Sequence, residues 1–161
     1  MENIIKVGMA DLQTATYPDI LTTLGLGSCV GIALFDQVRK IAGLAHIMLP
    51  SSKQVVNNSN IAKFADTGIE KLLEEMLRLG ANKANIKAKM AGGAQMFSFS
   101  EASDIMRIGA RNVASSKEKL KELGIPVISE DTGGCYGRTI ELHSASGKLL
   151  IKTIGHGVKE I

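Results

Sequence analysis

The chain has 161 residues, of which 45% are apolar and 22% charged, and its formal net charge is +3. This length and balance predict one globular domain over residues 1–161. The basic residues are scattered among acids and no apolar run reaches the ~18 residues of a membrane span, so we expect neither nucleic-acid binding nor membrane insertion.

Eight short segments are apolar or alternate in polarity, which is typical of β-strands. They are Ile4–Met9, Ile20–Leu24, Val30–Phe35, Ile41–Met48, Ile86–Met90, Val127–Ser129, Thr139–Leu142 and Lys148–Ile154. The connections between the early segments are too short for a helical crossover. We therefore expect the early strands to pair in an antiparallel arrangement.

Two further segments show the apolar spacing of amphipathic helices. The first is Asn60–Leu79, followed by Gly80, and the second is Gly109–Leu123, followed by Gly124. Glycine commonly ends a helix at this position. With strands on either side of these helices, the expected fold class is α+β: a layered sandwich of mixed or antiparallel β-sheet with two main helices packed on it.

The segment TLGLGSCV, residues 23–30, places Cys29 in a bend of small residues. It leads into a predicted hairpin with the turn QVRK. If this turn is centred between Gln37 and Val38, Cys29 lies opposite His46. Cross-strand neighbours have Cβ atoms about 4.5–5.5 Å apart, so the thiol and the imidazole could share a hydrogen bond.

Such a pair suits nucleophilic catalysis, because a neighbouring histidine lowers the pKa of a thiol and can return its proton to a leaving group. The small residues Gly27 and Ser28 would admit a substrate and leave backbone N–H groups for an oxyanion. Two alternatives remain open at this point. Cys29 could be an inert buried thiol, or it could form a zinc site with His46 and Cys135, although no metal-ligand spacing supports that site.

The second cysteine, Cys135, shows no sign of activation in the sequence. Two cysteines do not form a disulfide framework. We therefore expect both thiols to stay reduced and the protein to be cytoplasmic.

Two other glycine-rich turns occur in KMAGGAQMF, residues 89–97, and EDTGGCYGRT, residues 130–139. Neither matches a nucleotide-binding fingerprint. They could be tight turns that need positive φ, phosphate-binding loops, or walls of the Cys29 pocket. In the last case the substrate and oxyanion pocket would contain Gly27, Ser28, Gly92, Gly93, Thr132 and Gly133.

Five motifs together resemble the CheD family of chemoreceptor glutamine deamidases. They are TLGLGSCV, LAHIMLPSS, AGGAQMF, IGARN and EDTGG, and they extend over nearly the whole chain. The resemblance implies a fold similar to that of deamidating bacterial toxins with a cysteine nucleophile. It also implies a catalytic triad, with Cys29 as nucleophile, His46 as base and Thr23 as the residue that orients the imidazole.

The same resemblance implies a reaction and partners. The protein would hydrolyse side-chain amides of specific glutamines in methyl-accepting chemotaxis receptors to glutamate, through a cysteine thioester. It would also regulate the phosphatase CheC, and no metal or organic cofactor is expected. The competing hypothesis is a non-catalytic binding module that docks on CheC and on receptors.

Overall fold

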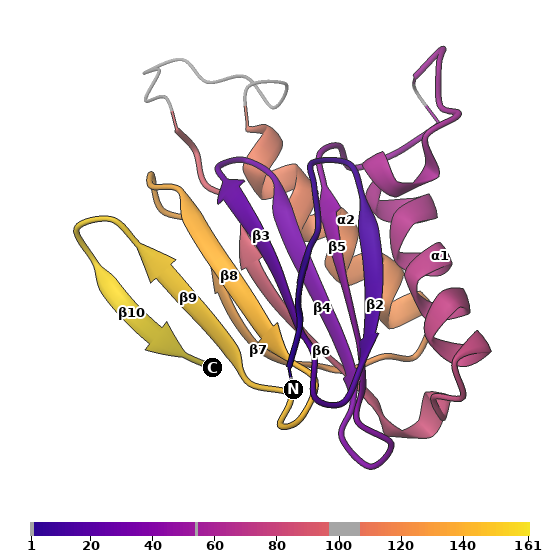
Figure 1. Ribbon diagram of the computed structural model, residues 1–161. Helices are drawn as coiled ribbons and strands as arrows, with labels where there is room; N and C mark the ends of the chain where they lie inside the picture. Colours follow the sequence, from indigo (N-terminus) through magenta and orange to yellow (C-terminus); the bar gives the residue numbers. More distant parts are fainter. Residues whose placement is uncertain (1, 54, 97–106) are drawn as a thin grey trace.

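The computed structural model describes residues 2–53, 55–96 and 107–161, which form two five-stranded β-sheets and two α-helices (Figure 1). The outer sheet has the order β1 (Ile4–Lys6), β3 (Ile20–Leu26), β8 (Arg138–His143), β9 (Leu149–Thr153) and β10 (Gly157–Glu160). The central sheet has the order β2 (Leu12–Thr16), β5 (Ile41–Ile47), β4 (Val30–Asp36), β6 (Ile86–Gly92) and β7 (Val127–Thr132). The helices are α1 (Ala65–Arg78) and α2 (Ile108–Glu122), with short 3₁₀ turns η1 (Ile61–Lys63) and η2 (Lys83–Asn85).

The central sheet is the middle of three layers. All seven residues of β4 are buried. Ile32 and Leu34 belong to the apolar cluster that includes α1 and α2, whereas Ala33 and Phe35 pack in the cluster shared with the outer sheet. Successive side chains of a strand point to opposite faces, so a strand covered on both faces is apolar throughout. This layering confirms the predicted α+β sandwich with two main helices.

Helix α1 is amphipathic, as its apolar spacing predicts. Ile69, Leu72, Leu73 and Met76 are buried on one face against the central sheet. The helix stops before Gly80, whose φ of 106° is favourable for glycine and strained for other residues.

Both helices lie on the same side of the central sheet (Figure 1). In the described part of the chain, no helix is long and apolar enough to cross a bilayer.

Two strands, β2 and β10, lie outside the predicted segments, and β2 changes the topology. After β1 the chain leaves the outer sheet, and β2 pairs antiparallel with β5 in the central sheet. Because this strand intervenes, β1 and β3 pair in parallel, with Ile4 beside Ile20. The expectation that the early strands all pair antiparallel is therefore wrong for β1 and β3. Strands β6 and β7 are also parallel, and α2 lies in the connection between them.

The β4–β5 hairpin has a four-residue loop, which shifts its register from the predicted one. Asp36 pairs with Ile41, and Gly31 pairs with His46. The buried Asp36 carboxylate accepts hydrogen bonds from two backbone N–H groups of the loop, at 3.0 and 3.1 Å, which stabilises this length. The prediction that Cys29 lies directly opposite His46 is wrong, because Cys29 is two residues beyond the partner of His46.

Candidate active site

Three strands bring Thr23, Cys29 and His46 to the space between the two sheets. Thr23 lies on β3 of the outer sheet and His46 on β5 of the central sheet, while Cys29 immediately precedes β4. All three residues are buried. Cys29 is two residues from Gly31, the partner of His46, so it is a diagonal neighbour of His46 on the same face. Such neighbours are about 7–8 Å apart, somewhat farther than the predicted opposed pair.

A hydrogen-bonded chain determines the protonation of the His46 ring. The Thr23 hydroxyl donates to the Val7 carbonyl at 2.7 Å, and Thr23 Oγ1 lies 2.7 Å from His46 Nδ1. A hydroxyl has one proton and the carbonyl can only accept, so the Val7 carbonyl takes that proton. Thr23 therefore accepts from His46 Nδ1–H. In the neutral imidazole this leaves Nε2 unprotonated.

His46 Nε2 is the end of this chain. It is buried and has no hydrogen-bond partner among the residues that the structure describes. Buried polar atoms are usually paired, and an exception calls for a physical explanation. An unprotonated imidazole nitrogen on the same face as a cysteine one pleat away is suited to accept a thiol proton.

Burial keeps both members of the pair neutral. Desolvation raises the pKa of the Cys29 thiol above its usual 9.0, an effect that a hydrogen bond from its own backbone N–H opposes. Desolvation also lowers the pKa of His46 below its usual 6.5. The expected lowering of the thiol pKa by histidine is therefore wrong for this structure. At neutral pH the two groups are a thiol and an imidazole rather than a thiolate and an imidazolium.

Comparison with known proteins adds independent information. Residues 48–153 match the family model described as CheD chemotactic sensory transduction. A protein of Caldanaerobacter subterraneus subsp. tengcongensis, named probable chemoreceptor glutamine deamidase CheD, is 63% identical over 98% of both chains. The chemoreceptor glutamine deamidase CheD of Halalkalibacterium halodurans is 53% identical over the whole of both chains.

This chain belongs to the CheD family. Among solved structures, the hypothetical protein YfiH of Bacillus licheniformis is similar with a TM-score of 0.49 and 19% identity, over 78% of this chain and 51% of that one. The family-model match begins two residues after His46, whereas the alignment with the Halalkalibacterium relative includes the whole N-terminal part. In this CheD-family chain, Thr23, Cys29 and His46 all lie outside the matched range 48–153.

The cysteine loop, residues 27–29, is held in place by hydrogen bonds to the backbone carbonyl of each of its three residues. The Gly27 carbonyl accepts from the N–H of Ala94 at 2.9 Å, and the Cys29 carbonyl accepts from the N–H of Gly93 at 2.9 Å. The Ser28 carbonyl accepts from the side-chain amide of Asn112 at 3.0 Å. A backbone carbonyl and the N–H of the next residue point in opposite directions. The N–H groups of Ser28 and Cys29 therefore lie on the side of the loop opposite to the Gly27 and Ser28 carbonyls.

The structure separates the pocket residues that sequence analysis grouped together. The N–H groups of Gly27, Gly93 and Gly133 already donate to backbone carbonyls at 2.9–3.0 Å. The Thr132 hydroxyl donates to the Glu130 carboxylate at 2.9 Å. In the described part of the chain, the Ser28 N–H has no acceptor and the Cys29 N–H has none except its own thiol. These two are the candidate oxyanion donors.

Gly92 and Gly93 instead explain how the turn after β6 can approach Cys29 closely. Gly92 has φ of 105°, and a Cβ at this position would collide with the Cys29 carbonyl oxygen. Gly93 has φ of 66° and uses its N–H on the same carbonyl. The N–H groups of Gly93 and Gly133 are engaged with backbone carbonyls and are therefore not available to a phosphate. Gly92 and Gly93 form a wall of the cysteine loop.

The zinc alternative required Cys135 beside Cys29. The structure leaves both cysteines as free thiols, with Cys135 exposed and Cys29 buried. Among the described residues, no three His, Cys, Asp or Glu side chains are grouped so that they could hold a metal ion. Of the three groups in the zinc alternative, only the Cys29 thiol and the His46 imidazole are buried.

Two groups at this site were missed by sequence analysis. The Val7 carbonyl, which accepts from Thr23, is a backbone atom and leaves no mark on the sequence. Asn112 lies in the IGARN motif, which supported the family resemblance but received no role. That motif was the signal from which Asn112 could have been found.

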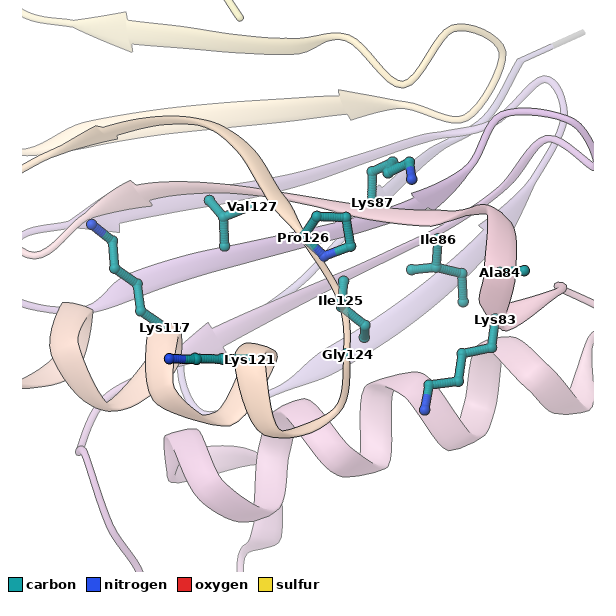
Figure 2. Close-up of a pocket in the computed structure, with 10 residues that line it drawn as sticks. All are labelled: Lys83, Ala84, Ile86, Lys87, Lys117, Lys121, Gly124, Ile125, Pro126 and Val127. Atoms are coloured by element: carbon teal, nitrogen blue, oxygen red, sulfur yellow. The ribbon is translucent and has the colours of Figure 1, made fainter.

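A surface hollow of about 640 Å³ lies away from this site, where β6 and β7 begin beside the end of α2 (Figure 2). Four lysines line it, Lys83, Lys87, Lys117 and Lys121. Their side chains point in different directions (Figure 2), and Lys117 forms an ion pair with Glu130 at 2.8 Å. The hollow therefore presents no convergent set of cations to an anionic ligand, and none of the triad residues lines it.

Proposed function

We propose that this protein is a chemoreceptor glutamine deamidase in which Cys29 is the nucleophile, His46 the base and Thr23 the orienting residue, within a single domain over residues 1–161. One observation carries the proposal. The Thr23–Val7 hydrogen bond sets the His46 tautomer and leaves a buried, unprotonated Nε2 on the face that carries Cys29. The names of the curated relatives support the substrate class.

The reaction begins from the neutral pair. The Cys29 sulfur attacks the carboxamide carbon of a glutamine side chain while His46 Nε2 removes the thiol proton. The C–N bond stays intact in this step, and the electron pair of the C=O bond becomes an oxyanion. The N–H groups of Ser28 and Cys29 donate to that oxyanion.

The intermediate then collapses and is hydrolysed. The C=O bond re-forms, the C–N bond breaks, and imidazolium Nε2–H protonates the departing nitrogen to give ammonia and a γ-glutamyl thioester. Water attacks the thioester while His46 removes one of its protons. The C–S bond breaks, the sulfur recovers its proton from His46, and the glutamine has become glutamate. Throughout, Thr23 accepts from Nδ1–H and stabilises the ring orientation.

Partner binding belongs to the same proposal. The substrate glutamine lies on an exposed helix of a methyl-accepting chemotaxis receptor, and the phosphatase CheC is a second partner whose activity the protein regulates. Both cysteines are free, which suits the reducing cytoplasm. The proposed reaction needs no metal or organic cofactor.

A second candidate function, the non-catalytic binding module, is favoured by one observation: burial raises the pKa of the Cys29 thiol. Slow alkylation of Cys29 does not separate the two functions, because a neutral thiol–imidazole pair is also expected to react slowly. Catalysis itself separates them.

The test is a purified receptor fragment containing the target glutamine, incubated with wild type, Cys29→Ala or His46→Ala. Mass spectrometry should detect conversion of the amide to the acid with the wild type alone. Equal conversion by Cys29→Ala would falsify the mechanism. Binding of the fragment by wild type without any conversion would favour the module.

A further inference from the structure

Asn112 connects the two segments that carry the reacting groups. Its side-chain nitrogen Nδ2 donates to the Ser28 carbonyl and to the Met48 carbonyl, at 3.0 Å each. Ser28 directly precedes Cys29, and Met48 follows His46 by two residues. One fully buried amide on α2 therefore holds the cysteine loop against the end of the histidine strand.

Helix α2 is placed to make this contact by its first turn. A Cβ on Gly109 would lie 2.6 Å from the Gly93 carbonyl oxygen and would also collide with the Ala94 carbonyl. Only a glycine allows the helix to approach this turn so closely. Because Gly93 in turn donates to the Cys29 carbonyl, the helix, the turn and the cysteine loop form one packed unit.

The hydrogen bond to the Ser28 carbonyl determines where the Cys29 N–H points. The only cis peptide bond in the described residues is Tyr17–Pro18, so the bond between Ser28 and Cys29 is trans. In a planar trans peptide, the carbonyl and the following N–H point in opposite directions. When Asn112 holds this carbonyl, the Cys29 N–H points away from the Asn112 side chain.

We propose that Asn112 is a positioning residue that aims the Cys29 N–H at the oxyanion of the tetrahedral intermediate. The proposal rests on the function proposed above, with Cys29 as nucleophile. Asn112 does not touch the substrate, and it acts through the Ser28–Cys29 peptide.

The two ends of the Asn112 amide differ in their hydrogen bonding, because in the part of the chain that the structure describes only the nitrogen has partners. Asn112 Oδ1 is buried and has no hydrogen-bond partner among the described residues. An apolar side chain of similar shape would remove this unpaired oxygen, but it would also leave the Ser28 and Met48 carbonyls without their donor, so Asn112→Leu should lose some stability as well. The two donated hydrogen bonds are what such a replacement would remove.

The first test compares Asn112→Leu with wild type in the deamidation assay. Leucine keeps the approximate shape and removes both donors. We expect kcat to fall about 10- to 100-fold, because the Cys29 N–H is no longer held in the direction of the oxyanion. KM should change less than about threefold, since ground-state binding of the substrate is retained. Asn112→Asp, which also loses donor capacity, should move kcat in the same direction and serves if the leucine variant does not fold.

Alkylation supplies the readout that a merely structural role would not give. Iodoacetamide reacts with a thiol by displacement at a saturated carbon, so no oxyanion forms on the attacked carbon. In a Cys135→Ser background, the alkylation rate of Cys29 in Asn112→Leu should stay within about twofold of its Asn112 counterpart, while deamidation falls.

The matched control is Ser115→Ala. Ser115 lies on the same turn of α2 and donates to the Pro50 carbonyl at 2.6 Å, outside the cysteine loop. This variant should keep wild-type kcat. Wild-type kcat in folded Asn112→Leu or Asn112→Asp, or a parallel loss of deamidation and alkylation, would overturn the positioning role. Activity of Cys29→Ala would instead overturn the proposed function itself, and the Asn112 role with it.

Discussion

Thr23 Oγ1 and His46 Nδ1 lie 2.7 Å apart although they belong to different sheets. The Val7 carbonyl accepts the only hydroxyl proton of Thr23, so the hydroxyl oxygen is an acceptor toward the ring. This single relationship assigns Nδ1–H as the tautomer of the neutral ring. It thereby identifies Nε2 as the nitrogen that is free to act as a base.

Replacement of Thr23 should separate orientation from stability. Thr23→Val keeps the shape but leaves Nδ1–H without its acceptor, so we expect kcat for deamidation to fall by about 10- to 10³-fold. Thr23→Ser should retain most of the activity because the hydroxyl remains. The neighbouring Thr22, whose hydroxyl donates to the Ile140 carbonyl at 2.9 Å, is the matched control. Thr22→Val should lower the thermal unfolding temperature without lowering kcat, and equal losses in both valine variants would contradict the role of Thr23.

The pH profile of deamidation should reflect the lowered pKa of His46. The imidazole must be neutral to accept the thiol proton, and burial lowers its pKa below 6.5. The acid limb of kcat/KM should therefore lie below pH 6.5, and activity should be level as the pH rises from there toward neutrality. Initial rates measured across this range give the limb directly. A limb above pH 6.5 would show that a charged imidazolium is stabilised in the free protein.

The same shift makes stability depend on pH. Because the folded pKa of His46 is lower than the unfolded value of 6.5, the unfolded state binds more protons between the two values. The contribution of His46 is thus fully present above pH 6.5 and is lost as the pH falls through the folded pKa. Urea unfolding of wild type and His46→Gln at several pH values measures it. The difference between the two should narrow as the pH is lowered, and a constant difference would contradict the burial effect.

The two thiols should react differently with iodoacetamide. Cys135 is exposed, whereas Cys29 is buried with a pKa raised above 9.0 by desolvation. At neutral pH we expect Cys135 to be alkylated first and Cys29 only slowly, with a rate that still increases beyond pH 9.0. Peptide mapping of the alkylated protein reports each site. Faster alkylation of Cys29 than of Cys135 would mean that a thiolate is present at rest.

Gly92→Ala should destabilise the wall of the cysteine loop. An alanine Cβ at this position would collide with the Cys29 carbonyl oxygen, and φ is 105°. Gly80 has nearly the same φ, 106°, and a Cβ added there would have no atom within 4 Å, so Gly80→Ala isolates the backbone strain. We expect Gly92→Ala to lower the free energy of unfolding by about 1–3 kcal/mol more than Gly80→Ala does. Chemical denaturation of both variants measures the difference, and equal losses would show that the loop yields to the added methyl group.

Local patterns predicted much of the fold correctly. The apolar periodicity and the glycine stops located both ends of α2 and the end of α1 to within one residue, because an amphipathic helix must bury one face. Helix α1 begins at Ala65, later than the predicted Asn60, because Ile61–Lys63 form a separate 3₁₀ turn. The apolar runs located β4, β5 and β6, which are covered on both faces. Strand β2, with the sequence LQTAT, is half polar and lies at the edge of its sheet, and β10 is exposed throughout. Neither has the apolar pattern that identifies a buried strand.

The candidate site was predicted in its residue types and not in its geometry. Cys29 in a bend of small residues and His46 on the next strand were enough to suggest a thiol–imidazole pair. Their relative position depended on the loop of the β4–β5 hairpin, whose length follows from the hydrogen bonds of Asp36. A register shift of two residues keeps the Cys29 and His46 side chains on the same face of the sheet. The two residues are therefore still neighbours although the predicted register was wrong.

The sequence by itself therefore determined the strand and helix segments, the family and the chemical character of the site, since these depend on local periodicity and on motifs. Only the tertiary structure decided the protonation of His46 and the direction of the pKa shifts. Thr23 reaches His46 across two sheets, and Asn112 reaches Ser28 across 84 residues of chain. Contacts of this kind arise from the packing of layers, and the desolvation that keeps Cys29 and His46 neutral arises from the same packing.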